Sequence, residues 1–266
     1  METKQALVTG ATSGIGLEIS KNLAERGFSL VLTARKREPL EALSKTLQET
    51  YGVSVEYCIG DLEDPKTPQV LYDFCQKRGF TISLLVNNAG YSLPTPFHET
   101  PMDAEERFLR VLSLAVIALT KLFLKDMIKA KQGNIMMISS VAAFAPPSSI
   151  QTLYGPVKTF VNRFSEGLNL NYNHMGIKST AVCPGYTITN FHTASGVQEQ
   201  MDRVPAFMKK SASRVAKEAV TATLKGKKVC VPTKTFKLIV FLLKVLPHSL
   251  FPLFSKRLAP GRYNHE

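Results

Sequence analysis

The stretch Thr9-Gly10-Ala11-Thr12-Ser13-Gly14-Ile15-Gly16 follows a short apolar run and opens a segment whose apolar residues recur at helical spacing. A glycine-rich turn between a strand and a helix N-terminus favours the binding of a phosphate group. Glycine lets the backbone approach closely, and the free N–H groups and the helix dipole attract negative charge. The spacing is G-x-x-x-G-x-G and not the commoner G-x-G-x-x-G of dinucleotide-binding turns. The stretch predicts a strand, a phosphate-binding turn and a helix, with a plain connecting turn as the alternative.

Apolar runs of strand length alternate with helical patterns along the rest of the chain. We predict strands near Ala6–Val8, Leu30–Thr33, Val53–Cys58, Ile82–Val86, Asn134–Ile138, Ser179–Cys183 and Val229–Val231. We predict helices near Gly14–Arg26, Pro39–Tyr51, Pro68–Arg78, Asp103–Lys131, Leu153–Asn173 and Ala212–Lys225. Such alternation indicates a parallel sheet covered on both faces, with right-handed crossovers. We therefore expect an α/β fold: a Rossmann-like, doubly wound parallel sheet of about seven strands with helices on both faces.

The composition and the absence of linkers limit the number of domains and the class of protein. No repeat or Gly/Ser linker divides the sequence, so we expect one Rossmann-like dinucleotide-binding and catalytic domain over 1–232, with an apolar, basic helical tail over 233–266 in the same unit. Hydrophobic residues make up 44% and charged residues 20% of 266 residues, which is typical of a globular chain. The four scattered cysteines predict reduced thiols and no metal site. No signal-peptide pattern is present, so a cytoplasmic location is expected.

The basic residues are concentrated near the C-terminal end. Residues 1–199 contain 19 Lys and Arg against 18 Asp and Glu, whereas residues 200–266 contain 14 against 3. This asymmetry predicts an anionic partner, either a membrane surface, a nucleic acid or a phosphorylated substrate. Nucleic acid is disfavoured because the basic region has no recognition motif and little aromatic interleaving for stacking.

Two segments break the alternation of strands and helices. Tyr186–Ser211 is expected to be irregular and follows a strand at the edge where such folds bind ligands, so it is interpreted as a substrate lid, with an ordinary surface loop as the alternative. Thr235–Leu258 is apolar but is interrupted by lysine and proline, which predicts two short amphipathic helices and not a membrane span. The tail can lie peripherally on an anionic membrane, or it can cap the substrate pocket or an oligomer interface; both interpretations stay open.

A tyrosine and a lysine lie one helical turn apart in Tyr154-Gly155-Pro156-Val157-Lys158. A free tyrosine has a pKa of about 10, and a neighbouring ammonium lowers it by favouring the phenolate. Such a tyrosine can donate a proton to a carbonyl, or accept one in the reverse direction. Ser140 ends a predicted strand, and its hydroxyl can hydrogen-bond the same carbonyl oxygen.

Five motifs together resemble, in order and spacing, the short-chain dehydrogenases/reductases. They are Thr9–Gly16, Asn87-Asn88-Ala89-Gly90, Ser140, Tyr154 with Lys158, and Pro184-Gly185-Tyr186-Thr187-Ile188-Thr189. The resemblance covers roughly residues 4 to 231. It points to the compact single-domain branch, and within it to NADPH-dependent ketoacyl and hydroxysteroid reductase-like members.

The resemblance implies roles for particular residues. The implied catalytic residues are Ser140, Tyr154 and Lys158. The implied cofactor-binding residues are Gly10, Thr12, Ser13, Gly14, Ile15, Gly16, Arg35, Lys36, Asp61, Leu62, Asn88, Ala89, Gly90, Tyr154, Lys158, Pro184, Gly185, Ile188 and Thr189. It also implies a homodimer or homotetramer.

The residues after the second predicted strand bear on the choice of cofactor. NAD-binding folds place an acidic residue there to hold the ribose 2′-hydroxyl. This chain has Arg35, Lys36 and Arg37, with no acidic residue before Glu38. Because guanidinium suits bidentate contact with phosphate, the sequence predicts NADP(H), with Arg35 as the main contact; a solvated basic loop is the alternative.

The chain departs from the family pattern in the central helix. Members usually carry an asparagine there, which positions a water that links the lysine to solvent. Counting without gaps places Leu112 at that position, and shifts of register offer Ser113 or Ala115. We therefore expect an impaired or rerouted proton relay.

Two smaller departures lie near the tyrosine. The interval from Ser140 to Tyr154 is one residue longer than usual, which leaves Ser139 as an alternative to Ser140. Pro156 is tolerated only in the first turn of a helix, so we expect this helix to begin near Leu153.

Two functions follow from these expectations. The first is an NADPH-dependent oxidoreductase that reduces a ketone, or oxidises a secondary alcohol, on a hydrophobic substrate such as a 3-oxoacyl chain or a sterol-like ketone. The second is a non-catalytic NADPH-binding regulatory protein at a membrane.

Overall fold

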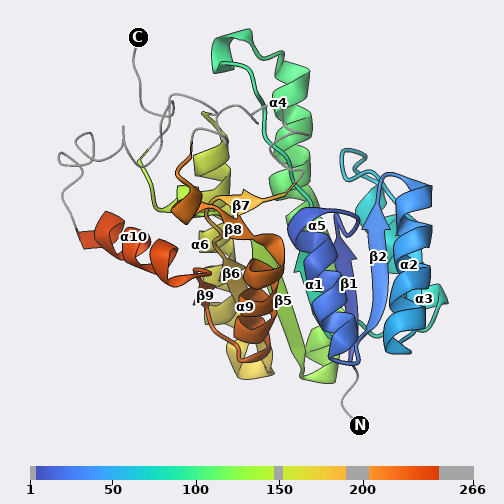
Figure 1. Ribbon diagram of the computed structural model, residues 1–266. Coiled ribbons are helices and arrows are strands. Elements are labelled where there is room, and N and C mark those ends of the chain that lie inside the picture. The colour runs from blue at the N-terminus through green and yellow to red at the C-terminus, as the bar shows by residue number, and fades with distance from the viewer. Residues whose placement is uncertain (1–3, 147–151, 190–203, 246–266) are drawn as a thin grey trace.

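The computed structural model describes residues 4–146, 152–189 and 204–245, and Figure 1 shows a central parallel sheet between helices. Seven strands pair in the order β3-β2-β1-β4-β5-β6-β9, all parallel. The strands are β1 (Gln5–Thr9), β2 (Ser29–Ala34), β3 (Val55–Ile59), β4 (Leu84–Asn87), β5 (Gly133–Ile138), β6 (Ile177–Val182) and β9 (Val229–Cys230). The predicted doubly wound, Rossmann-like sheet is confirmed.

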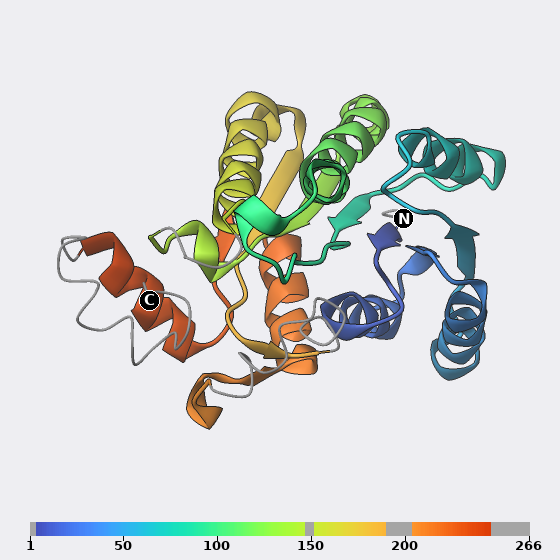
Figure 2. The ribbon, with the colours of Figure 1, turned by 90° about the horizontal axis from the view of Figure 1, so that it is seen from above.

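Helices cover both faces of this sheet, as the view from above in Figure 2 shows. One face carries α3, α5 and α6, and the other carries α1, α2 and α9. The bounds are α1 (Gly14–Glu25), α2 (Arg37–Tyr51), α3 (Thr67–Lys77), α4 (Met102–Leu109), α5 (Ala115–Ala130), α6 (Tyr154–Tyr172), α9 (Ala212–Leu224) and α10 (Lys234–Val245). Helix α10 lies beyond the β9 edge of the sheet (Figure 1).

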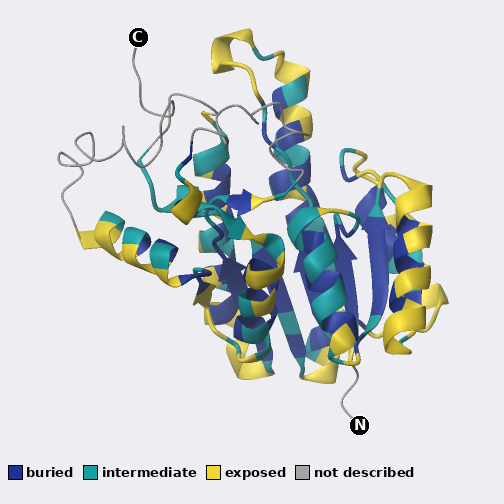
Figure 3. Ribbon diagram, in the orientation of Figure 1, coloured by how far each residue is buried: buried dark blue, intermediate teal, exposed yellow. Residues whose placement is uncertain are grey.

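The central strands are buried on both faces, which explains their continuous apolar runs (Figure 3). Two apolar cores result. One packs α3, α5 and α6 on the sheet and includes Phe108 and Phe123; the other packs α1, α2 and α9 and includes Ile19 and Leu40. The carboxyl ends of the strands therefore sit on a rigid frame, and the predicted site residues lie at those ends.

The predicted helix 103–131 is present as a continuous helical segment over 102–130, but the sequence did not predict the π-helical turn inside it. The chain forms α4, then a π-helical turn over Arg110–Leu114, then α5. Within this turn the Ser113 hydroxyl donates to the Leu109 carbonyl, a side-chain bond that competes with the regular helical pattern. Two predicted strands also begin later than expected, at Val55 and Leu84.

The segment 186–211 is more regular than predicted. Its described residues include a two-stranded parallel sheet of β7 (Thr187–Ile188) and β8 (Lys210–Ser211), while the centre of the predicted lid, 190–203, lies outside the described residues. One helix of the predicted tail is present as α10, and 246–266 lies outside the described residues. None of the helices within the described ranges has the length and apolar character needed to cross a membrane.

Candidate active site

The glycine-rich turn lies between β1 and α1 and is shaped by close backbone contacts. Gly10 and Gly14 have positive φ angles of 63° and 54°, a region that side chains disfavour. A Cβ on Gly16 would collide with the Gly10 carbonyl and with the Asn88 amide. Ser13 is the N-cap residue of α1 and is exposed. The turn therefore forms a tight cradle at a helix N-terminus, and this geometry fits a pyrophosphate.

Asn88, at the end of β4, ties this turn to the sheet. Its side-chain amide donates to the carbonyl of Thr9 at 2.8 Å and to that of Gly10 at 3.1 Å. The Thr9 hydroxyl accepts from the backbone N–H groups of Asn88 and Ala89. The motif 87–90 thus holds the shape of the turn, a structural role beside its implied contact with cofactor.

The basic residues Arg35 and Lys36 lie exposed at the carboxyl end of β2. Arg35 is close enough to Tyr91 for its charge to act on that phenol. The pKa of Tyr91 is nevertheless raised to about 12, first by burial and then by the Glu63 carboxylate. Tyr91 and Glu63 therefore border the predicted 2′-phosphate region, although neither belongs to a motif that marks it in the sequence.

The predicted adenine-side residues follow β3. The Asp61 carboxylate accepts a hydrogen bond from the Glu63 backbone N–H at 3.0 Å, and its carbonyl accepts from the Thr67 hydroxyl. The Leu62 side chain is buried in the apolar core, which leaves its backbone for the implied contact with the cofactor. Asp61 is exposed and stays available to a ligand.

Tyr154 and Lys158 lie on consecutive turns of α6. The predicted helix start near Leu153 is confirmed, since Leu153 is its N-cap and Pro156 lies in the first turn. Lys158 is buried, and its Nζ donates to the Ile138 carbonyl at 2.8 Å. This Nζ lies 5.6 Å from the centre of the Tyr154 ring. Burial lowers the pKa of Lys158 to about 8, with a small opposing effect of Cys183.

The two serines after β5 have different surroundings. Ser139 is buried, and its hydroxyl donates to the Lys158 carbonyl at 2.9 Å, which fastens α6 to the sheet. The Ser140 oxygen accepts from the Ala142 backbone N–H at 3.1 Å and caps a short 3₁₀ turn. That bond uses Ser140 only as an acceptor, so its own proton can be donated to a substrate oxygen. The geometry favours Ser140 over Ser139 as the serine of the site.

The motif 184–189 passes beside both the tail helix and the glycine-rich turn. The Pro184 carbonyl accepts from the Val141 N–H at 2.9 Å. A Cβ on Gly185 would collide with the ring of Phe236 in α10, and a Cβ on Gly14 would lie 3.1 Å from Thr189. Ile188 is exposed beside these residues. The structure thus brings the first and last motifs of the sequence together.

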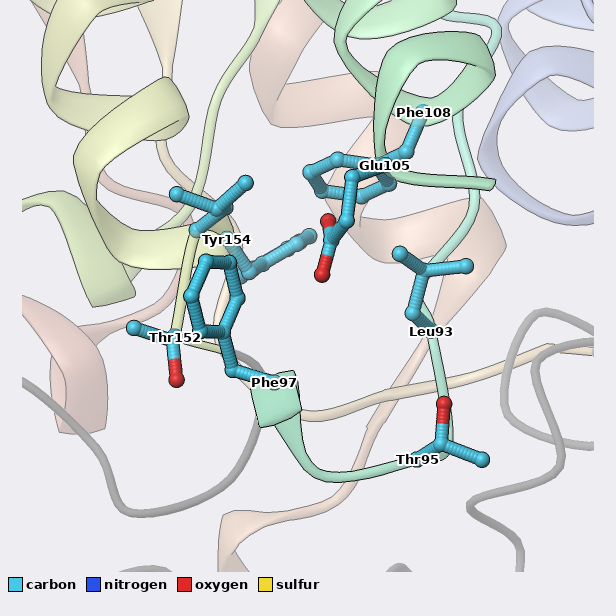
Figure 4. A pocket seen from close by; sticks show the side chains of 8 residues that line it. Leu93, Thr95, Phe97, Glu105, Phe108, Thr152 and Tyr154 are labelled. Atoms are coloured by element: carbon cyan, nitrogen blue, oxygen red, sulfur yellow. The ribbon is translucent and has the colours of Figure 1, made fainter. Parts of the chain in front are cut away.

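A pocket opens beside Tyr154. It is lined by Leu93, Thr95, Phe97, Glu105, Phe108, Thr152, Leu153 and Tyr154. In Figure 4 the side chains of Phe97, from the loop after β4, and Glu105, from α4, point into the same space as the Tyr154 ring. The lining combines apolar side chains with the polar groups of Thr95, Thr152, Glu105 and Tyr154. Glu105 and Phe108 were not among the predicted site residues, because no local signal in the sequence marks which face of α4 meets α6.

The position expected to carry the family asparagine is apolar. Leu112 lies in the π-helical turn, is buried, and would lie 3.6 Å from a Cβ on Gly90. The Lys158 ammonium instead has the Ile138 carbonyl as its partner. The expectation of a rerouted relay stays a prediction.

Comparison with known proteins gives consistent results. The short chain dehydrogenase family matches residues 4–200. A very-long-chain 3-oxoacyl-CoA reductase of Anas platyrhynchos is 35% identical over 196 residues, covering 71% of this chain. The match with the Anas platyrhynchos reductase covers 62% of that protein. Hydroxysteroid dehydrogenase-like protein 1 of Gallus gallus is 29% identical to this chain, and the match covers 81% of this chain and 64% of that protein. The chain therefore spans about three fifths of the length of these curated relatives.

A solved structure matches over almost the whole chain. A short-chain dehydrogenase from Sphingobium yanoikuyae, in complex with NADPH, is 28% identical and superposes with a TM-score of 0.82. The superposition covers 98% of this chain and 99% of that one. The fold, the ordered motifs and the extent of the family match lead to one conclusion: this chain belongs to the short-chain dehydrogenase family.

Proposed function

We propose that this protein is an NADPH-dependent oxidoreductase that interconverts a ketone and a secondary alcohol on a hydrophobic substrate. The observation that carries the proposal is the placement of Tyr154 at the pocket, one helical turn from the buried ammonium of Lys158. The cradle at Gly10, Gly14 and Gly16 fits the pyrophosphate of the cofactor. When bound, NADPH supplies a hydride to the carbonyl carbon.

Lys158, Tyr154 and Ser140 have different roles in the transfer of the proton. The positive charge of Lys158 favours the phenolate form of Tyr154 and so makes its proton easier to donate. Tyr154 donates this proton to the carbonyl oxygen, and the Ser140 hydroxyl hydrogen-bonds the same oxygen as negative charge develops there. Because the Lys158 pKa is about 8, its ammonium is mostly protonated at neutral pH. In the oxidation direction, Tyr154 accepts the proton of the alcohol.

The pocket supports a hydrophobic substrate. Leu93, Phe97, Phe108 and Leu153 make up half of its eight lining residues, and an apolar substrate that packs against them is stabilised by the removal of apolar surface from water. Relatives named as 3-oxoacyl-CoA reductases make a 3-oxoacyl chain the first substrate class to test, with sterol-like ketones second. The test mixes purified protein and NADPH with 3-oxoacyl thioesters, sterol ketones or short ketones and measures the loss of nicotinamide absorbance. NADPH binding without turnover across all three classes would contradict the proposal.

Reversing the charge of Arg35 is expected to remove the preference for NADPH. Arg35→Asp loses charge-assisted hydrogen bonds to the 2′-phosphate, so we expect NADPH affinity to fall about tenfold to a hundredfold while NADH affinity does not fall. Binding of each cofactor is measured by isothermal titration calorimetry. Lys129→Asp, an equal charge change at an exposed position of α5, is the control and should leave both affinities unchanged. An equal loss of both cofactors in Arg35→Asp would contradict the assignment.

A non-catalytic NADPH-binding regulator is the competing function. The relatives reported above are named as reductases or dehydrogenases, so they give it no support. Retention of a biological effect in a variant without turnover would favour it. The implied homodimer or homotetramer stays a prediction.

We further propose that α10 contacts anionic membranes. Leu238, Phe241 and Val245 are each more than half exposed on this helix, while Phe236 and Val240 pack inward. Lysines at 234, 237 and 244 accompany the exposed apolar residues. An amphipathic helix with this combination suits the boundary between acyl chains and anionic headgroups.

Removing the exposed apolar residues of α10 is expected to weaken membrane binding. We expect the double variant Leu238→Ser/Phe241→Ser to bind phosphatidylserine-containing vesicles at least about tenfold more weakly in flotation at low salt, because two large apolar side chains no longer enter the bilayer. Leu170→Ser, at an 84% exposed position of α6, is the matched control. Wild-type protein that stays with the soluble fraction at low salt would remove the proposal.

A further inference from the structure

A buried carboxyl group faces the pocket that contains Tyr154. Glu105 belongs to α4 and is 5% exposed, although glutamate is rarely buried without a partner. Its Oε2 atom is buried and has no hydrogen-bond partner among the described residues. Figure 4 shows both carboxylate oxygens pointing away from α4 and into the space between Phe97, Leu93 and Tyr154. The group is therefore aimed into the pocket and not into the packed core.

The surroundings of Glu105 do not compensate its charge. Burial raises the pKa of this carboxyl, and among the described residues no cation acts against that effect. The other polar side chains of the pocket, apart from the Tyr154 phenol, are the hydroxyls of Thr95 and Thr152. Buried polar groups are paired in most proteins, so an unpaired one that faces a pocket requires an explanation.

A structural role in α4 explains the burial of the Glu105 carboxyl less well than a role in binding a ligand. Glu105 lies in the first turn of this helix, where a carboxylate can stabilise the helix dipole or cap free N–H groups. Asp103 and Glu106 are also acidic and lie at exposed positions of the same helix, where no burial opposes their charge. The dipole therefore does not require a buried carboxyl at position 105.

We propose that Glu105 determines specificity by binding a neutral hydrogen-bond donor of the substrate, a hydroxyl or an amide N–H, close to the carbonyl that reacts at Tyr154. This inference deepens the proposed reductase function and rests on it. Glu105 and Tyr154 line the same pocket, so a donor that reaches Glu105 lies close to the carbon that reacts at Tyr154. A carboxylate or phosphate at the same place would be repelled.

The test compares ligands that differ only in the donor. One pair is methyl hexyl ketone and hydroxymethyl hexyl ketone; the other is a 3-oxoacyl ethyl thioester and the matching N-acetylcysteamine thioester, whose amide supplies an N–H. Dissociation constants are measured by calorimetry with NADP⁺ present, which prevents reduction. The proteins are wild type, Glu105→Leu, Glu105→Gln and the exposed neighbour Glu106→Gln as control.

We expect wild type to bind the donor-bearing member of at least one pair about tenfold to a hundredfold more tightly. The pair that shows the preference identifies the donor as hydroxyl or amide. Glu105→Leu should lose this preference and raise KM for that ligand with little change in kcat. Glu105→Gln should keep part of the preference, because its amide oxygen still accepts a hydrogen bond, and Glu106→Gln should match wild type.

Three results would overturn the inference: equal binding within both pairs by wild type, an unchanged preference in Glu105→Leu, or a uniform loss of all ligands together with a lower melting temperature. The last result would indicate a structural role. A Glu105-dependent preference without any NADPH-driven reduction would instead overturn the proposed function and leave this inference standing.

Discussion

Replacing Tyr154 with phenylalanine is expected to reduce kcat about a thousandfold, within the range that a positioned general acid contributes. The change removes only the phenolic oxygen from a half-buried ring at the start of α6. Hydride could still be delivered, but the developing alkoxide would have no proton donor. The measurement is the rate of NADPH oxidation with the best ketone found in the screen.

The same variant should keep its cofactor affinity within about twofold, because the phenylalanine ring retains most of the packing and the phosphate-binding turn lies on a different element. Lys158 and Ser140 should likewise keep their contacts with the Ile138 carbonyl and the Ala142 N–H. A variant that turns over at more than a tenth of the wild-type rate would show that another group donates the proton. Loss of NADPH binding would indicate disturbed packing and would require Tyr154→His as a second variant.

Gly16→Ala is expected to abolish measurable NADPH binding and to destabilise the fold by about 2 kcal/mol, as overpacking commonly does. The new methyl group would collide with the Gly10 carbonyl, which is backbone and cannot move without opening the turn. It would also displace the Asn88 amide that donates to Thr9 and Gly10. Both the cradle and its support would change shape.

A matched control is available in α6. Gly167 has no atom within 4 Å of the place where a Cβ would lie, so Gly167→Ala should bind NADPH normally and unfold at an equal or higher temperature. Thermal unfolding and cofactor titration are compared for the two variants. NADPH binding by Gly16→Ala at wild-type affinity would mean that the turn does not hold the pyrophosphate.

The sheet and its helices could be predicted because each buried parallel strand is a continuous apolar run and each helix has one apolar stripe. The same patterns could not reveal the π-helical turn at 110–114, since the Ser113 hydroxyl alters the helix there without breaking the apolar periodicity. The two-residue strands β7 and β8 are too short to carry any period.

The site was predictable only where its residues form local motifs. The turn 9–16 and the pair Tyr154 and Lys158 could be read from spacing within one segment. Glu105 could not, because its burial depends on contacts among α4, the loop that carries Phe97 and the start of α6, which are distant in sequence. The choice between Ser139 and Ser140 likewise needed the contact of Ser139 with the Lys158 carbonyl.

The contact between Gly185 and Phe236 has an evolutionary consequence. The aromatic ring occupies the space where any other residue at position 185 would place its side chain. The two positions are therefore coupled: a larger residue at 185 requires the ring at 236 to move or to be replaced by a smaller side chain. Because position 236 lies on α10 and position 185 beside the site, selection on how the tail helix packs constrains which substitutions the site can accumulate.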